Sequence, residues 1–210
     1  MMNELKIGQP TLLASDLEGV LIPEIWEAVA EKTQIKQLFL TTRDIADYDE
    51  LMKLRLRVLT EHHITLADIH AVIETINPLP GAVEMINWIR QQTRLIVITD
   101  SFYEFLTPLL PKLGYPTIFA HSLQVDEQGM LCGYQLRLTQ GKRKAVHALK
   151  EIGFRVMAFG DSYNDTAMLA EADFGALFNP PAKVVADFPH FPVVRDYEQL
   201  KVLATDFLKA

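Results

Sequence analysis

A short apolar run that ends in an acid most constrains how this chain can fold. Residues Leu12 to Ala14 are apolar, Asp16 lies two residues further on, and Glu18 and Gly19 follow. The apolar run is too short for a helix and predicts a buried strand. Gly19 lets the chain turn away without a Cβ penalty. Asp16 is therefore expected at the carboxyl end of a strand, where open α/β sheets bind their ligands.

Asp16 and Glu18 are the first candidate site residues. Side chains two residues apart on an extended segment point to the same side, so both carboxylates can face one site. Two carboxylates in one site repel each other unless a cation or a proton separates them. The simpler alternative is a strand end that carries two solvated acids before a turn.

Apolar runs and helical stretches alternate along the rest of the chain. Further strands are predicted at 95–98, 118–120, 156–159 and 175–178, helices at 82–92, 102–113, 142–152, 164–172 and 197–208, and a hairpin at 123–138. Strands that alternate with helices are typical of a parallel sheet with right-handed crossovers. We therefore predict a Rossmann-like α/β fold, in which helices cover both faces of a parallel sheet.

Residues 23–77 differ because they predict helices and no strand. Pro23 can open a helix, and leucines recur at helical spacing between residues 51 and 59. Thr65 and Asp68 have the spacing of a capping box. We predict that this segment is a small helical cap, inserted after the first strand. The catalytic core would then consist of residues 1–22 and 78–210.

Composition excludes several functional classes. The 210 residues suit one α/β domain with a small insertion, and they carry a formal net charge of −7 without a Lys/Arg-rich run, so a nucleic-acid partner is not expected. No apolar run is long enough to cross a bilayer, and the first residues lack the core of a signal peptide. Cys132 is the single cysteine, which argues against a disulfide framework and a cysteine-based zinc site. A cytoplasmic location is the default expectation.

Three predicted strands end in polar residues. The triplets are Asp16-Leu17-Glu18, Thr99-Asp100-Ser101 and Gly160-Asp161-Ser162. Because parallel strand ends meet at one edge of a sheet, these acids should form a cluster. Its members are Asp16, Glu18, Asp161 and Asp165, with Thr99 as a hydroxyl donor. A set of oxygens favours Mg²⁺ over zinc, and Mg²⁺ suggests a phosphate substrate because it binds phosphate oxygens together with carboxylates.

Four motifs resemble, in order, those of the haloacid dehalogenase superfamily. They are Asp16-x-Glu18-Gly19-Val20, Thr99, Lys142 and Gly160-Asp161-x-x-Asn164-Asp165. One such motif is a weak signal, whereas four in order on the expected elements are specific. From about Leu12 onward the chain resembles the phosphoserine phosphatase branch, and within it the variety that transfers phosphate to homoserine. Further segments similar to that variety are Pro-Glu-Ile-Trp, Thr-Thr-Arg-Asp-Ile, Asp-Tyr-Asp and Phe-Tyr-Glu-Phe.

The resemblance implies a role for each catalytic residue. Asp16 would attack phosphorus and form an aspartyl phosphate. Glu18 would protonate the leaving serine oxygen and later take a proton from the acceptor. Glu18 stands where phosphatases of this branch usually have aspartate, so its acid group is displaced outward by one methylene. Thr99 would hold phosphate oxygens, and Lys142 would offset the developing charge, with Lys144 as the competing lysine.

The resemblance also implies a Mg²⁺ site. Asp16, Asp161 and the backbone carbonyl of Glu18 would hold the ion. Asp165 would be either a further ligand or a residue that supports the ligands.

Four more residues are implied to bind substrate. Glu24 and Arg55 match residues that hold the amino and carboxylate groups of phosphoserine, although each could be an ordinary helix charge. Asp100 stands where the family often has glycine. Its N–H would hold phosphate oxygens, and its carboxylate would either select the substrate or be a solvated turn acid. Asn164 would contact the substrate or orient Asp161.

Together these implications favour a Mg²⁺-dependent enzyme that hydrolyses L-phosphoserine and can transfer the phosphoryl group to L-homoserine. One alternative is a phosphatase of the same mechanism that acts on another small phosphomonoester, such as a sugar phosphate or a nucleotide. A more remote alternative is a non-catalytic aspartyl-phosphate receiver, a class that lacks the helical insertion and an acid placed like Glu18. The sequence does not fix the oligomeric state, and a homodimer is compatible with it.

Overall fold

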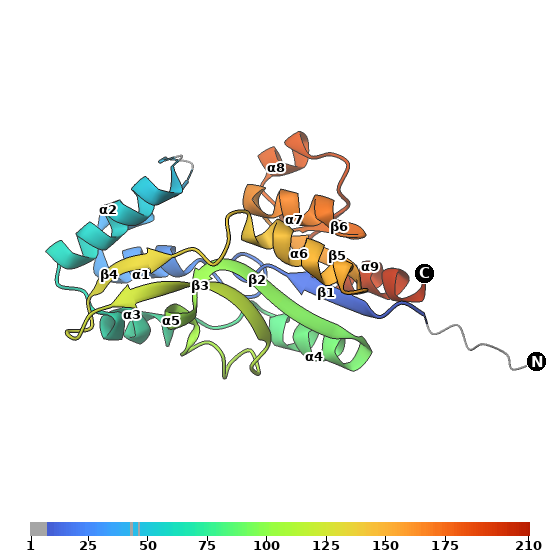
Figure 1. Cartoon of the computed structure of the whole chain (residues 1–210), viewed down its shortest axis with the longest axis horizontal. Helices are drawn as coiled ribbons and strands as arrows, with labels where there is room; N and C mark the ends of the chain where they lie inside the picture. Colours follow the sequence, from blue (N-terminus) through green and yellow to red (C-terminus); the bar gives the residue numbers. More distant parts are fainter. Residues whose placement is uncertain (1–7, 43, 46) are drawn as a thin grey trace, which may run out of the picture.

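The computed structural model describes residues 8–42, 44–45 and 47–210 (Figure 1). Arg43, which belongs to the Thr-Thr-Arg-Asp-Ile segment, lies outside the described residues. The sheet has the strand order β4-β3-β2-β1-β5-β6-β7. Its strands are β1 (Thr11–Ser15), β2 (Arg94–Phe102), β3 (Thr117–Val125), β4 (Leu131–Gln135), β5 (Arg155–Gly160), β6 (Phe174–Phe178) and β7 (Val193–Val194). Only β4 runs antiparallel to its neighbour among these described strands. The predicted parallel sheet is therefore confirmed, with β1 at its centre.

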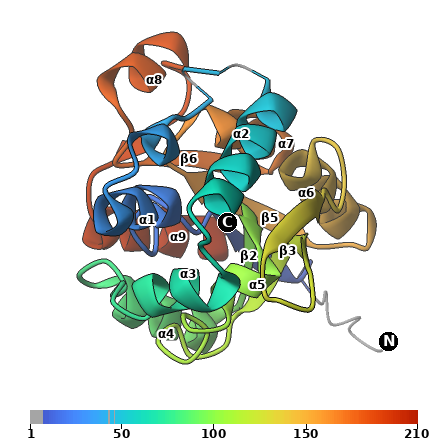
Figure 2. The same cartoon turned by 90° about the vertical axis from the view of Figure 1, so that its left-hand side faces the viewer.

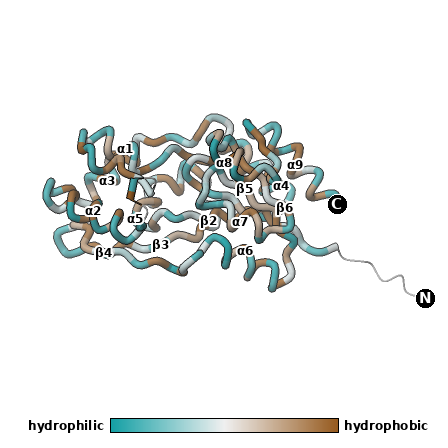
Figure 3. Tube along the Cα trace, turned by 90° about the horizontal axis from the view of Figure 1, so that it is seen from above, coloured by the Kyte–Doolittle hydropathy of each residue, from teal (hydrophilic) through white to brown (hydrophobic). Residues whose placement is uncertain are grey.

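Helices cover both faces of the sheet, as predicted. The longer ones in this half of the molecule are α4 (Ala82–Gln92), α6 (Gly141–Glu151), α7 (Thr166–Glu171), α8 (Ala182–Asp187) and α9 (Tyr197–Lys209). Leu12 and Ala14 of β1 pack in one hydrophobic cluster with α6, α7 and α8. Leu13, which points the other way, packs in a second cluster with α4 and α9. Teal and brown residues alternate along the outer helices because each has one polar and one apolar side (Figure 3).

The segment between β1 and β2 is helical, as expected. It contains α1 (Ile25–Thr33), the 3-10 helix η1 (Lys36–Phe39), α2 (Tyr48–Glu61) and α3 (Leu66–Ile73). The Thr65–Asp68 capping box is present. These helices gather at one end of the molecule (Figures 1 and 2), and the β3–β4 hairpin extends to the same end. Tyr134 of β4 donates to Asp49 of α2 across 2.6 Å. The boundaries of a cap at residues 23–77 remain a prediction.

Three predictions about local structure were wrong. The strand expected at 118–120 and the first strand of the hairpin expected at 123–138 are one strand, β3. The second strand does not end at residue 98 but continues through Thr99, Asp100 and Ser101 to Phe102, with a register shift against β3. The helix expected at 102–113 is only α5 (Tyr103–Leu106). Pro108 and Pro111 explain the shortening, since proline lacks the amide hydrogen that a helix needs. No helix in the described part of the chain is both long and apolar enough to cross a membrane.

Candidate active site

Asp16 lies directly after β1, at the carboxyl edge of the sheet. Its N–H donates to the carbonyl of Phe159 in the neighbouring β5 at 3.0 Å. Its Oδ1 accepts from the N–H of Leu17 at 2.7 Å and lies 2.8 Å from Lys142 Nζ. The side chain is buried, and this burial, together with the charge of Asp165, raises its pKa well above the ordinary value. Asp16 is thus fixed in orientation by partners on both sides.

Lys142 lies in the first turn of α6 and joins three carboxylates. Its Nζ is 2.8 Å from Asp16 Oδ1, 2.8 Å from Asp165 Oδ1 and 3.7 Å from Asp100 Oδ2. Burial opposes the charge of Lys142, but the nearby carboxylates outweigh it and hold its pKa well above the usual range. Lys144 is exposed. Of the two candidate lysines, the fold therefore brings Lys142 into the cluster.

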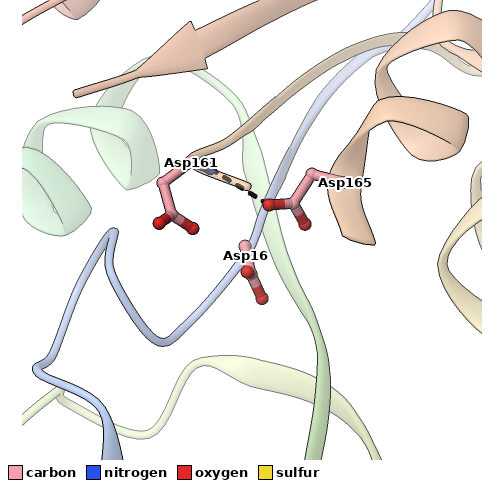
Figure 4. A group of neighbouring side chains, drawn as sticks. All are labelled: Asp16, Asp161 and Asp165. Carbon is pink, nitrogen blue, oxygen red and sulfur yellow. Dashed lines mark hydrogen bonds between the residues drawn. The ribbon is translucent and has the colours of Figure 1, made fainter. Parts of the chain in front are cut away.

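Asp16, Asp161 and Asp165 bring one carboxylate oxygen each within 4.8 Å of one another (Figure 4). Burial and the charge of Asp165 raise the pKa of Asp161 to about 7, so these acids repel when no cation is bound. A divalent cation would relieve this repulsion. Oxygen ligands suit a hard cation such as Mg²⁺, so the residues present fit the ion that the sequence predicted.

Two glycines of the motifs let these carboxylates approach. Gly19 has φ +74°, and a Cβ placed there would lie 2.6 Å from the carboxyl carbon of Asp161. A Cβ at Gly160 would lie 2.2 Å from the carboxyl carbon of Asp165. Any larger residue would push a carboxylate out of the cluster, which explains why glycine stands at both positions.

Asp165 holds its own loop together. Its Oδ2 accepts from the N–H of Asp161 at 3.0 Å (Figure 4) and from that of Ser162 at 3.1 Å. Its Oδ1 lies 2.8 Å from Lys142 Nζ. Both oxygens of Asp165 thus have partners within the protein. This geometry favours the role of Asp165 as a support for Asp161 and Lys142.

Glu18 is not among the three aspartates that bring their carboxylate oxygens together. Its Oε1 accepts from the N–H of Ile25, in the first turn of α1, at 2.7 Å. Burial, assisted by the charge of nearby Glu24, raises the pKa of Glu18 to about 7. A carboxyl group with this pKa can exchange a proton near neutral pH. The hydrogen bond from Ile25 holds the Glu18 side chain, and the predicted metal contact involves only its backbone carbonyl.

Thr99 and Asp100 both belong to β2. The Thr99 side chain is buried, and its Oγ1 accepts from the N–H of Ser101 at 3.1 Å. The carboxylate of Asp100 lies 3.5 Å from His121 Nε2 as well as near Lys142. Burial opposes ionisation of Asp100, but Lys142 and His121 outweigh it and lower its pKa below the ordinary value. Asp100 is thus a paired acid at a strand end.

His121 was missed by the sequence analysis. It lies in β3, is buried, and accepts from the N–H of Arg137 at Nδ1 across 3.1 Å. A single histidine within a strand carries no motif. Its partner Asp100 is distant in sequence, so only the pairing of β2 with β3 brings the two together.

Arg55 of α2 is 7% exposed, so it is not one of the solvated charges of that helix. Its guanidinium donates to the carbonyl of Leu40 at 2.9 Å and lies 4.5 Å above the ring of Trp26. Burial lowers the pKa of Arg55 to about 10. Its Nε has no hydrogen-bond partner among the described residues. Glu24, by contrast, is exposed just before α1.

A cavity of about 340 Å³ lies between the start of α2 and the sheet edge. Its lining includes Tyr48, Asp100, His121, Lys142 and Asn164. Its volume is within the range of small-molecule sites. Asn164 is exposed and also lines this cavity.

The model of the haloacid dehalogenase-like hydrolase family matches residues 10–173, which include every candidate residue described above. The chain belongs to this family. The resemblance inferred from the four motifs is thereby confirmed. Haloacid dehalogenase-like hydrolases are enzymes, so the chain is a hydrolase and not a non-catalytic receiver.

Two relatives of this hydrolase cover nearly the whole chain. Phosphoserine phosphatase ThrH of Pseudomonas aeruginosa is 53% identical over 195 residues, which are 93% of this chain and 94% of the relative. A phosphoserine phosphatase of Pseudomonas syringae pv. tomato is also 53% identical over 195 residues, 93% of this chain and 81% of the relative. These matches confirm the resemblance to the phosphoserine phosphatase branch.

Solved structures share the fold of this hydrolase. A phospho-aspartyl intermediate analogue of phosphoserine phosphatase superposes with a TM-score of 0.76 at 18% identity, over 93% of this chain and 99% of the other. A substrate-bound phosphoserine phosphatase superposes with a TM-score of 0.75 at 17% identity, over 94% and 98%. At these identities the likeness concerns the fold, and it agrees with the α/β architecture predicted from sequence.

Proposed function

We propose that this hydrolase removes the phosphoryl group of L-phosphoserine through an aspartyl phosphate on Asp16, and can pass it to L-homoserine. One observation carries the proposal: the buried Asp16 carboxylate is held by Lys142 beside two further aspartates. The 53% identity to a relative named phosphoserine phosphatase ThrH supports the choice of substrate.

Asp16 and Asp161 would hold Mg²⁺, with Asp165 supporting them. When bound, the ion would neutralise part of the charge on the phosphate and on the aspartates. The raised pKa of Asp161 supports this assignment, because burial and the charge of Asp165 disfavour a further negative charge that a divalent cation would offset.

In the first step, a carboxylate oxygen of Asp16 forms a bond to phosphorus. The bond from phosphorus to the serine oxygen breaks, and its electron pair stays on that oxygen. Glu18 donates its proton there, so serine leaves as a neutral alcohol. Lys142, already 2.8 Å from Asp16, offsets the negative charge that gathers on the phosphoryl oxygens.

In the second step, the hydroxyl group of the acceptor attacks phosphorus. The acceptor is water or L-homoserine, and Glu18 takes its proton. The bond from phosphorus to the Asp16 oxygen breaks, and the carboxylate is regenerated. Glu18 thus returns to the protonated state in which the cycle began.

Arg55 would bind the carboxylate of the substrate. Its buried Nε lacks a hydrogen-bond partner among the described residues, and such a group needs one. Trp26 and Leu40 hold the guanidinium in place before substrate arrives. Glu24, which is close enough to Glu18 to raise its pKa, would accept from the substrate ammonium group.

The direct test measures phosphate release from L-phosphoserine with Mg²⁺ and traps the phosphorylated enzyme. We expect label from ³²P-phosphoserine to remain on the acid-quenched protein, and to be absent from Asp16→Asn. Asp206→Asn, an exposed aspartate on α9, is the matched control and should behave like wild type. Equal activity of Asp16→Asn and wild type would refute the proposal.

A second test separates phosphoserine from other phosphomonoesters. Arg55→Ala should lose activity on phosphoserine while keeping activity on p-nitrophenyl phosphate, which has no carboxylate to bind. Equal loss on both substrates would show that Arg55 does not recognise the amino acid, and would favour another substrate of the same mechanism.

A further inference from the structure

The negative charge of Asp100 lies beside the expected phosphate site, where Lys142 and His121 compensate it. Asp100 and Asp16 share a partner, because both carboxylates lie near Lys142 Nζ. The distance to this nitrogen is 3.7 Å from Asp100 Oδ2 and 2.8 Å from Asp16 Oδ1. A site for a phosphate dianion gains nothing from a further anion, because like charges repel. Lys142 and His121 nevertheless keep the pKa of Asp100 low. The fold therefore maintains this charge for a group other than the phosphate.

His121 is built to hold Asp100. Its Nδ1 accepts the N–H of Arg137, so in the neutral ring the proton is on Nε2, which faces Asp100 Oδ1 at 3.5 Å. The side chain of His121 is 6% exposed, so the surrounding protein fixes the ring. The proton that faces Asp100 is thus set by a backbone contact on the opposite side of the ring.

Asp100 presents its charge to the cavity beside the phosphate site. Its side chain is 38% exposed, and it lines the cavity together with Tyr48 and Asn164. The charges of Asp100 and Arg55 both act on the hydroxyl group of Tyr48, so an anion and a cation lie near one wall residue. A molecule that carries an ammonium and a carboxylate group matches this pair.

We infer that Asp100 binds the ammonium group of the acceptor amino acid, and that His121 is the positioning residue that holds Asp100 toward the cavity. This inference rests on the proposed function, because an acceptor is used only after Asp16 has been phosphorylated. Homoserine has one methylene more than serine between its hydroxyl and its α-carbon. When its oxygen reaches the same phosphorus with an extended chain, its ammonium group lies farther from phosphorus than that of serine, and Asp100 supplies an anion for this second position.

The test is the partition of the phosphorylated enzyme between two acceptors. Phosphoserine and Mg²⁺ are supplied with increasing L-homoserine, and the ratio of phosphohomoserine to free phosphate is plotted against homoserine concentration. Both products come from one intermediate, so the slope does not depend on how much of a variant is folded or how fast Asp16 is phosphorylated. A purely structural defect therefore leaves the slope unchanged.

Variants of His121 separate its two contacts. In His121→Asn the new side-chain amide reaches the place of Nδ1 and loses the contact with Asp100, whereas the longer amide in His121→Gln reaches that of Nε2 and keeps it. We expect the slope to fall about tenfold in Asp100→Asn and in His121→Asn, as for a lost charge-assisted contact. His121→Gln should stay near wild type. The control His147→Asn, an exposed histidine on α6, should not change the slope.

The double variant Asp100→Asn/His121→Asn decides whether the two residues act as one unit. Its slope should equal that of Asp100→Asn, because His121 then has no charge to position. If wild type makes phosphohomoserine, either of two results overturns the inference. One is a loss of slope in the double variant that equals the product of the two single losses, and the other is an unchanged slope in Asp100→Asn. If wild type releases phosphate and makes no phosphohomoserine, the proposed transfer itself fails, and the inference fails with it.

Discussion

At the scale of single residues, the site depends on how closely carboxylates approach one another. Gly19 and Gly160 leave the space that Asp161 and Asp165 occupy. Lys142, which faces three acids, then offsets part of their negative charge. Small residues therefore matter here as much as the acids themselves.

Gly19→Ala should reduce activity by tenfold or more. The new Cβ would lie 2.6 Å from the carboxyl carbon of Asp161 and would displace it. Gly153→Ala is the matched control, because Gly153 also has a positive φ (+97°) but nothing lies within 4 Å of the added Cβ. Both variants should lose about 1 kcal/mol of stability from the left-handed backbone. Only Gly19→Ala should also need more Mg²⁺ for half-maximal activity; an equal Mg²⁺ requirement in both would contradict this view.

The raised pKa of Glu18, about 7, predicts a pH dependence. The protonated form is the acid needed in the first step, and it is present below pH 7 and lost above it. We expect kcat/KM for phosphoserine to fall by about tenfold per pH unit above 7. Glu18→Gln should be slow and should lack this alkaline decline. A decline that persists unchanged in Glu18→Gln would assign it to another group.

At the scale of elements, the proposed substrate-binding face is assembled from α1 and α2 together. Trp26 of α1 supports the guanidinium of Arg55, which belongs to α2. The backbone carbonyl of Leu40, between these helices, holds the same group. The position of Arg55 therefore depends on how the helices pack, not on α2 alone.

Trp26→Leu should raise KM for phosphoserine several-fold, since a cation over an aromatic face is worth about 0.5–2 kcal/mol. Trp88→Leu is a matched control, because Lys201 lies 5.6 Å over the ring of Trp88 on α4, away from the site. It should leave KM unchanged. The measurement is steady-state kinetics on both variants, and an equal rise in KM would mean that general destabilisation is the cause.

At the scale of the whole molecule, one hydrophobic cluster joins the helices between β1 and β2 to the sheet. It includes Val29 and Met52 from those helices, and Leu13 and Phe159 from the strands. Trp26 also packs edge-on against Phe105 of α5, at 5.4 Å between ring centres. This continuity opposes independent unfolding of the predicted cap.

We expect a single unfolding transition seen by both tryptophans. Trp88→Phe leaves Trp26 as the reporter of the helical end, and Trp26→Phe leaves Trp88 as the reporter of the sheet. Within each variant, the denaturant midpoint from fluorescence should coincide with that from circular dichroism. Loss of the Trp26 signal at lower denaturant would show that residues 23–77 unfold as a separate domain.

Mg²⁺ should stabilise the whole fold, and more so as the pH rises to neutral. The pKa of Asp161 is about 7 in the folded metal-free protein and lies near 3.8 when unfolded, so metal-free stability falls as pH rises through this window. Mg²⁺ at about 100 times its Kd adds about 2.7 kcal/mol, which corresponds to roughly 5–10 °C in Tm. Calorimetry at pH 5 and pH 7.5 would test this. A smaller shift at pH 7.5, or an equal shift in Asp161→Asn, would count against the assigned site.

Local patterns in the sequence determined much of this protein. The helix at 82–92 was predicted with its observed bounds, because its apolar spacing is a short-range signal. The position of Asp16 at the end of a central strand followed from one apolar run, and the cluster of aspartates followed from the rule that parallel strand ends meet at one edge.

Only the tertiary structure decided which partners these residues have. The pairing of Asp100 with His121, the choice of Lys142 over Lys144, and the burial of Arg55 each depend on elements that are distant in the chain. The extension of β2 to Phe102 likewise depends on its neighbour β3. Periodicity reports how one segment divides apolar from polar faces, whereas contacts between segments form only when the whole chain packs, and no local pattern encodes them.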